Sequence, residues 1–127
     1  MATILIVEDD KFLNRLYKDH FENEGIRAIS LEDGTDVMKI VLKEKPDVIL
    51  LDLIMPQKNG FDVLQELKAN PDTKNVPVFV SSVLHQNEDI DRVKNMGAYA
   101  YLAKYDKQFH DVVNEIKNYL LRLSPSK

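Results

Sequence analysis

The sequence predicts one α/β domain in which helices cover both faces of a parallel five-stranded sheet. Short apolar runs alternate regularly with longer amphipathic stretches along the 127 residues, and this alternation requires crossover connections between parallel strands. The length suits one compact domain, and a hydrophobic fraction of 44% is enough to form its core. We expect a three-layer sandwich of five βα units.

The first half of the chain is expected to hold two strands and two helices. Residues 4–7 form a continuous apolar run rich in β-branched side chains, which is typical of a strand buried on both faces. Residues 11–24 carry apolar side chains at helical spacing and are followed by a glycine. Residues 26–31 alternate apolar and polar side chains, which favours a more exposed strand at a sheet edge. A second helix opens at residues 33–35 and is closed by Pro46. The apolar side chains of the first helix are Phe12, Leu13, Leu16, Tyr17 and Phe21.

The second half continues the alternation. Residues 48–51 are another continuous apolar run and therefore a second central strand. The remaining elements are a helix over 61–69, a strand over 78–80 that finishes in Ser81 and Ser82, a polar helix over 88–96, a strand over 99–103 and a closing helix over 109–123. We expect the domain to span residues 1–123 and a flexible tail to follow over 124–127.

Composition excludes several classes of function. The 21 Asp and Glu residues against 17 Lys and Arg give a net charge of −4, which argues against a direct nucleic-acid binder. The absence of cysteine excludes a disulfide framework, a thiol nucleophile and a thiolate metal site. The sequence contains neither a signal peptide nor the apolar run of about 18 residues that a membrane span requires. We expect a cytoplasmic protein that contacts no membrane.

Polar or ionisable residues follow four of the predicted strands. They are Glu8-Asp9-Asp10, Asp52, Ser81-Ser82 and Lys104. Ligands of open α/β sheets bind at the carboxyl ends of the strands, where the strand order reverses. For the order 2-1-3-4-5 this point lies between the first and third strands, which end in the acidic cluster and in Asp52. We therefore expect the separated groups to converge in one cleft.

The chemistry of such a cleft favours phosphoryl transfer onto an aspartate. Neighbouring carboxylates repel each other unless a cation is present. Mg²⁺ prefers one or two carboxylates together with waters and phosphate oxygens, and a lysine and a hydroxyl on the opposite rim can bind further phosphate oxygens. A carboxylate beside a bound metal can itself act as the nucleophile and form an acyl phosphate.

Four segments together resemble the receiver domain of two-component response regulators. They are ILIVEDD (residues 4–10), PDVILLDLIMPQKNG (46–60), PVFVSS (77–82) and GAYAYLAK (97–104). The resemblance covers essentially residues 2–123 and implies a flavodoxin-like fold with the strand order 2-1-3-4-5. Because the sequence ends after the fifth helix, we expect no output domain in this chain. It would be either a single-domain regulator, similar to those of chemotaxis, or a receiver excised from a longer protein. The family is regulatory rather than enzymatic, apart from self-phosphorylation by small phosphodonors and slow self-dephosphorylation.

The resemblance implies roles in phosphoryl transfer and metal binding. Asp52 matches the phosphoacceptor, which takes its phosphoryl group from a sensor histidine kinase or a phosphotransfer protein. Asp9 and Asp52 match direct ligands of Mg²⁺, for which Mn²⁺ can substitute, and Glu8 matches a ligand that acts through water. The backbone carbonyl of Ile54 matches the remaining protein ligand.

The resemblance also implies a conformational switch. Lys104 and Ser82 match the residues that bind oxygens of the phosphoryl group, and Tyr101 matches an aromatic side chain that turns inward as the hydroxyl moves. The added charge of about −1.5 to −2 biases a two-state element. In this family that element is the surface of the fourth helix, fifth strand and fifth helix, which a downstream protein or output domain contacts. Such a receiver is a monomer or a dimer that depends on phosphorylation.

Two positions depart from the family pattern. Val83 stands where the family usually has a small residue, and its β-branched side chain can crowd the phosphoryl site or hinder Ser82. Tyr105 follows Lys104 where the family usually has proline, often after a cis peptide bond. A cis bond before a non-proline residue costs about 2.5–4 kcal/mol, so we expect a trans bond and an altered loop.

Three other functions match parts of the pattern. An aspartyl-phosphate phosphohydrolase typically has a second acid two residues after its nucleophile, where this chain has Ile54. A flavodoxin-like flavin carrier needs a loop rich in Ser, Thr and Gly after the first strand, where this chain has Glu8-Asp9-Asp10. A pseudo-receiver keeps the fold as an interaction module without phosphorylation. The complete set of site residues argues against it, and Val83 and Tyr105 keep it open.

Overall fold

Five strands and five helices alternate along the described part of the chain, as the sequence predicts. The computed structural model describes residues 2–83, 87–104 and 108–123, so the expected tail over 124–127 lies outside the described residues. No helix in these three ranges is long and apolar enough to span a bilayer. In chain order the elements are β1 (Thr3–Val7), α1 (Lys11–Asn23), β2 (Arg27–Leu31), α2 (Val37–Glu44), β3 (Val48–Asp52), α3 (Gly60–Ala69), β4 (Val78–Ser82), α4 (Asn87–Asn95), β5 (Ala100–Ala103) and α5 (Phe109–Leu123).

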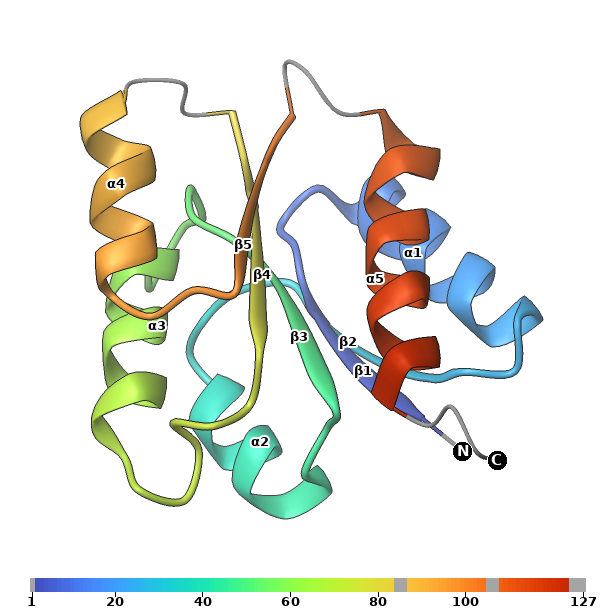
Figure 1. The fold of residues 1–127 in the computed structure, drawn as a ribbon, viewed down its shortest axis with the longest axis horizontal. Helices are drawn as coiled ribbons and strands as arrows, with labels where there is room; N and C mark the ends of the chain where they lie inside the picture. The colour runs from blue at the N-terminus through green and yellow to red at the C-terminus, as the bar shows by residue number, and fades with distance from the viewer. Residues whose placement is uncertain (1, 84–86, 105–107, 124–127) are drawn as a thin grey trace.

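The strands pair in parallel in the order β2-β1-β3-β4-β5, which confirms the predicted topology. Helices α1 and α5 cover one face of the sheet, and α2, α3 and α4 cover the other (Figure 1). The carboxyl ends of all strands share one edge, the upper edge in Figure 1. At this edge β1 continues into α1 on one face while its neighbour β3 continues into α3 on the other. The connections therefore diverge beside the ends of β1 and β3.

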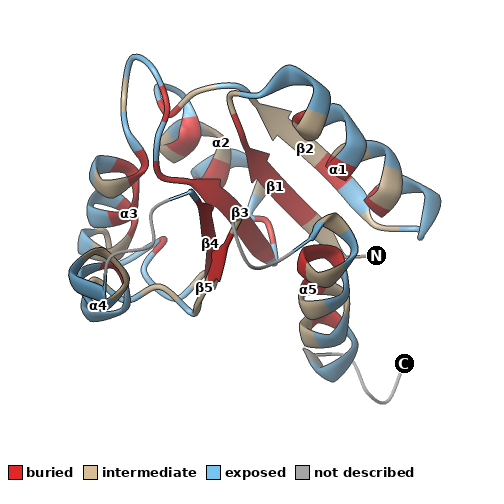
Figure 2. Cartoon of the chain, turned by 90° about the horizontal axis from the view of Figure 1, so that it is seen from above, coloured by how far each residue is buried: buried red, intermediate tan, exposed pale blue. Residues whose placement is uncertain are grey.

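Two buried clusters, one on each face of the sheet, hold the three layers together. On the face of α1 and α5, strand residues such as Ile6 pack with Phe21 and Ile116. On the other face, strand residues such as Leu51 pack with Leu64 of α3. Every residue of β3 and β4 is buried (Figure 2). Strand β2 lies at an edge and keeps partly exposed side chains, as its alternating sequence predicts.

The buried face of α1 differs from the one that its apolar residues suggest. Phe12 is 74% exposed and Leu16 is 39% exposed, although both are among the apolar side chains at helical spacing. The polar residue Asn14 is buried instead, together with Tyr17 and Phe21. Steps of three and four residues place these three side chains on one helical face. The rotation of α1 against the sheet is therefore set partly by a polar contact.

Helix α2 begins at Val37, later than the expected opening at residues 33–35. The Asp33 carboxylate accepts hydrogen bonds from the Thr35 backbone N–H at 2.8 Å and from the Thr35 hydroxyl at 2.6 Å. The Asp33 side chain thus binds the Thr35 backbone N–H, and residues 33–35 form a turn instead of the first turn of the helix. The other expected boundaries agree with the structure within two residues.

Gly60 ties the start of α3 to the end of β3. Its N–H donates to the Leu53 carbonyl at 2.8 Å. A Cβ atom at this position would lie 2.6 Å from the Leu53 Cα and closer still to the Asp52 carbonyl oxygen. Glycine therefore permits an approach of two backbone segments that any side chain would prevent. The contact holds the segment that follows Asp52 in place.

We predict that Gly60→Ala destabilises the protein more than Gly25→Ala. At Gly60 the added methyl collides with backbone, and the overpacking costs about 2–3 kcal/mol. At Gly25 the backbone has a φ of 80° with no heavy atom within 4 Å of the new Cβ, so only left-handed strain of about 1 kcal/mol remains. Urea unfolding of both variants measures the difference. An equal or smaller loss for Gly60→Ala would contradict the close approach of α3 to β3.

Candidate functional site

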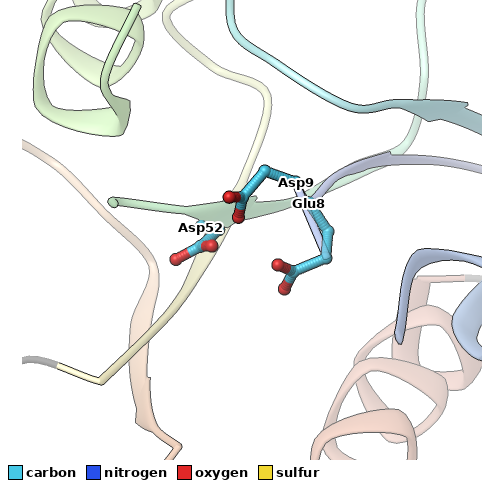
Figure 3. A group of neighbouring side chains, drawn as sticks. All are labelled: Glu8, Asp9 and Asp52. Atoms are coloured by element: carbon cyan, nitrogen blue, oxygen red, sulfur yellow. The ribbon is translucent and has the colours of Figure 1, made fainter. Parts of the chain in front are cut away.

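Three carboxylates converge at the carboxyl ends of the two central strands. Glu8 and Asp9 directly follow β1, and Asp52 is the last residue of the neighbouring strand β3. One carboxylate oxygen from each residue lies within 4.8 Å of the others, and Figure 3 shows the side chains gathered at the two strand ends. Glu8 and Asp52 are buried, at 2% and 4% exposure, and Asp9 is more exposed than either.

Asp10, the third acid of the sequence cluster, has a different task. Its side chain caps α1, because Asp10 Oδ1 accepts from the Leu13 backbone N–H at 3.0 Å. The Asp10 backbone N–H also donates to Glu8 Oε2 at 3.2 Å. Asp10 therefore stabilises the turn from β1 into α1 and orients the Glu8 carboxylate.

Lys104, just beyond β5, binds both buried carboxylates. Its Nζ lies 2.9 Å from Glu8 Oε1 and 3.4 Å from Asp52 Oδ2. Burial acts to lower the pKa of Lys104, but the bond to Glu8 and the charges of both carboxylates outweigh it, so the pKa is raised. The ammonium group is therefore held in its charged form, and its closer partner is Glu8.

Asp52 remains difficult to ionise in spite of this cation. Its burial, followed by the negative charge of Glu8, raises the pKa of Asp52 to about 8, and the charge of Lys104 offsets only part of the effect. A buried carboxylate beside a second buried carboxylate is a favourable place for additional positive charge. The donors are hard oxygens, which suit Mg²⁺ or Mn²⁺, so the residues present fit the expected metal.

The backbone after β3 folds back towards Asp52. The Ile54 N–H lies 3.3 Å from Asp52 Oδ1, and the Ile54 side chain is 48% exposed. Gly60 then closes the segment against α3 through its bond to Leu53. Ile54 thus stands beside the acidic cluster, and its role as a metal ligand through the carbonyl stays a prediction.

The two serines that end β4 face opposite sides of the sheet. Ser81 pairs in register with Asp52, and its hydroxyl is buried. Ser82 is fully buried, and strand alternation puts it on the face of Val80. Its carbonyl accepts from the Lys104 backbone N–H at 2.8 Å. The register therefore places Ser82 next to the lysine, on the face opposite to Asp52.

The remaining expected switch residues lie nearby. Tyr101 is partly buried and packs against the cluster on the face of α2, α3 and α4, which is also the face of Ser82. Val83 is 61% exposed, so its side chain points to solvent rather than into the core. Tyr105 and its peptide bond lie outside the described residues.

Two residues of α1 border the site and were not singled out from the sequence. Tyr17 is 3% exposed and stacks on Phe109 of α5 with ring centroids 5.1 Å apart. Burial, followed by the charge of Glu8, raises the pKa of Tyr17 to about 12. Asn14 is buried and bonds to the Glu8 backbone. Asn14, Tyr17 and Phe21 share one helical face, and this spacing could have indicated from the sequence that Asn14 and Tyr17 are buried. It does not indicate which group Asn14 bonds to.

Comparison with known proteins was consistent across sequence and structure. The family model of the response regulator receiver domain matches residues 4–116. The protein PilH of Pseudomonas aeruginosa is 36% identical over 106 residues, which cover 82% of this chain and 86% of PilH.

Two solved structures are similar over nearly the whole chain. The Mn²⁺-bound form of the response regulator Rcp1 has a TM-score of 0.79 and 31% identity, and the match covers 95% of this chain and 93% of that one. The phosphorylated cyanobacterial phytochrome response regulator RcpA has a TM-score of 0.84 and 30% identity, and the match covers 99% and 96%.

We predict that Asp52 makes the metal-free protein less stable as the pH rises. Its pKa of about 8 in the folded chain lies above the ordinary value of about 3.9 expected in the unfolded chain. Between these values the folded state binds a proton that the unfolded state lacks, so the free energy of unfolding falls with rising pH. Asp52→Asn removes this contribution. Between pH 5 and pH 8, the free energy of unfolding of Asp52→Asn should therefore rise by about 1–3 kcal/mol relative to that of wild type.

Urea unfolding in a chelator at both pH values measures this change. Asp36→Asn is the control, because Asp36 is exposed and its side chain makes no capping bond. A difference between Asp52→Asn and wild type that does not change with pH would show that Asp52 ionises normally.

Proposed function

The chain belongs to the response regulator receiver domain family, and on that premise we propose that it is a phosphorylation-controlled switch whose phosphoacceptor is Asp52. The donor is a phosphohistidine of a sensor histidine kinase or of a phosphotransfer protein. The observation that carries the proposal is the position of Asp52. It ends a central strand, within reach of two further carboxylates and of Lys104.

The proposed reaction transfers one phosphoryl group between side chains. An Asp52 carboxylate oxygen attacks phosphorus, the phosphorus–nitrogen bond of the phosphohistidine breaks, and its electron pair returns to the imidazole, which takes up a proton. Lys104 lies 3.4 Å from Asp52, where its ammonium group can bind an oxygen of the transferred group. The exposed side of the cluster at Asp9 leaves an approach for the donor.

Asp9 and Asp52 would hold Mg²⁺ directly, with Glu8 acting through water and the Ile54 carbonyl as a further ligand. When bound, Mg²⁺ supplies positive charge that lets the three carboxylates ionise together and that neutralises phosphoryl oxygens. The oxygen donors within 4.8 Å of one another support this assignment. The similarity to Rcp1, whose structure is a Mn²⁺-bound form, supports it further.

Phosphorylation would be read out at the end of the sheet that β4 and β5 form. Ser82 would bind a phosphoryl oxygen, and Tyr101 would follow it inward, since the two residues lie on the neighbouring strands β4 and β5. The surface of α4, β5 and α5 would then present a changed contact to a downstream protein. The similarity to RcpA, whose structure is a phosphorylated form, supports the phosphorylation step. A cytoplasmic location, and a state that is either a monomer or a dimer that depends on phosphorylation, stay predictions.

The competing functions are less well supported by the site. A phosphohydrolase of the aspartyl-phosphate type needs an acid at the position of Ile54, whose side chain is aliphatic and half exposed. The three acids that follow β1, of which Glu8 is buried, would repel a flavin phosphate. A pseudo-receiver differs from the proposed function only in the chemistry at Asp52, so a phosphorylation assay separates them.

We predict that acetyl phosphate with Mg²⁺ phosphorylates the protein at Asp52. Intact-mass spectrometry should show the addition of one phosphoryl group to wild type and none to Asp52→Ala. Asp36→Ala, which removes an exposed aspartate outside the cluster, should be modified like wild type. Absence of the adduct from wild type, or an equal adduct on Asp52→Ala, would refute the phosphoacceptor role and favour the pseudo-receiver.

We also predict that Mg²⁺ stabilises the folded protein through Asp9. Binding to the folded state alone adds about 1–2 kcal/mol at a concentration roughly tenfold above Kd. Thermal melts with and without Mg²⁺ should show this gain in wild type and in Asp36→Asn but not in Asp9→Asn. A melting temperature of wild type that does not respond to Mg²⁺ would count against the metal site.

A further inference from the structure

Asn14 joins two strand ends beside the acidic cluster. It is 5% exposed on α1, and its side-chain amide donates to the Glu8 carbonyl at 3.0 Å and to the Leu31 carbonyl at 2.9 Å. Both protons of the amide nitrogen are thereby engaged. Leu31 ends β2, and Glu8 directly follows β1. One buried side chain therefore fastens α1 to the ends of two adjacent strands.

The Glu8 carbonyl belongs to the peptide unit that links Glu8 to Asp9. Because a peptide unit is planar, the direction of the Glu8 carbonyl also sets the position of the Asp9 nitrogen and Cα. The Glu8 N–H donates to the Leu31 carbonyl at 3.1 Å, so Leu31 accepts from both Glu8 and Asn14. The backbone that carries both acids is thus held by β2 and α1 together.

The Glu8 side chain is fixed by two further contacts. One carboxylate oxygen accepts from the Asp10 N–H at 3.2 Å, and the other binds Lys104 at 2.9 Å. The Asp9 carboxylate, by contrast, interacts with that of Asp52. The point from which the Asp9 side chain starts is set by the backbone that Asn14 restrains.

From this geometry we infer that Asn14 is a positioning residue of the metal site. It holds the peptide between Glu8 and Asp9 in the orientation from which Asp9 can share a cation with Asp52. The inference rests on the proposed function, since it assigns a role within that site. Mg²⁺ and Mn²⁺ bind a defined set of oxygen ligands, and loss of a residue that orients metal ligands typically weakens affinity about 10–100-fold.

The test measures binding of Mn²⁺ alone to the full chain, from the paramagnetic resonance signal of free Mn²⁺. In Asn14→Leu, which keeps the size of the side chain but has no donor, Kd should rise about tenfold or more. Asn14→Ala is the second variant, because the space it leaves admits water to the two carbonyls and favours folding. Urea unfolding of each variant confirms that the measured protein is folded.

Thr73→Val is the matched control. Thr73 is 1% exposed, and its hydroxyl donates to the Leu67 carbonyl at 2.7 Å, so this variant also loses a buried bond from a side chain to a carbonyl. Thr73 belongs to the connection between α3 and β4, at the lower edge of the sheet and away from the acids (Figure 1). Thr73→Val should therefore be less stable than wild type but bind Mn²⁺ with the Kd of wild type.

The outcomes separate the inference from the proposed function. If wild type binds Mn²⁺ and Asp9→Asn does not, the site stands, and a Kd within twofold of wild type in a folded Asn14 variant overturns the positioning role alone. An equal loss of affinity in Thr73→Val also overturns it, because the effect would then follow stability. If wild type binds no Mn²⁺, both the metal site and the role of Asn14 are disproved.

Discussion

The burial of Glu8 and Asp52 beside each other at one sheet edge is the constraint on which the site depends. Two carboxylates removed from water repel each other, and the pKa of Asp52 stays raised although Lys104 binds both residues. Positive charge added at this place in the fold, or a change in the Asp52 carboxylate, therefore alters the repulsion between the two carboxylates. A switch needs such a place, because a ligand shifts an equilibrium only through a difference in its interaction with the two states.

The parallel sheet makes this arrangement possible. Register places Asp52 beside Ser81, and a backbone bond places Lys104 beside Ser82. Strand alternation then directs Asp52 towards α1 and α5 but Ser82 towards α3 and α4. The site thus extends over both faces of the sheet at one edge. Ser82 and Tyr101, which belong to the other face, lie on the first and second strands beyond that of Asp52.

Helix α1 contributes to the site through its polar residues rather than through its most apolar ones. Asp10 caps the helix, Asn14 bonds to the strand ends, and Tyr17 packs below the carboxylates against Phe109. Phe12, the most apolar side chain of the first turn, points to solvent. The helix is therefore placed by the hydrogen-bonding needs of the strand ends as well as by burial of apolar surface.

Much of the fold and of the site was predictable from the sequence. This part includes the order of the strands, the two central strands, and the meeting of Glu8, Asp9, Asp52 and Lys104. Continuous apolar runs identify central strands, and parallel strands must end at one edge, so the residues that follow them converge whatever the details of packing. The tertiary structure decided which neighbour performs which task. Asp10 caps a helix, while Asp9 joins the acidic cluster. Ser81 rather than Ser82 lies beside Asp52, and Lys104 lies closer to Glu8 than to Asp52. On α1, Asn14 is buried while Phe12 is exposed. These choices depend on the pleat of each strand, the rotation of α1 and the burial of each charge. Such properties arise only when segments distant in the chain pack together, so a linear pattern of residue types does not contain them.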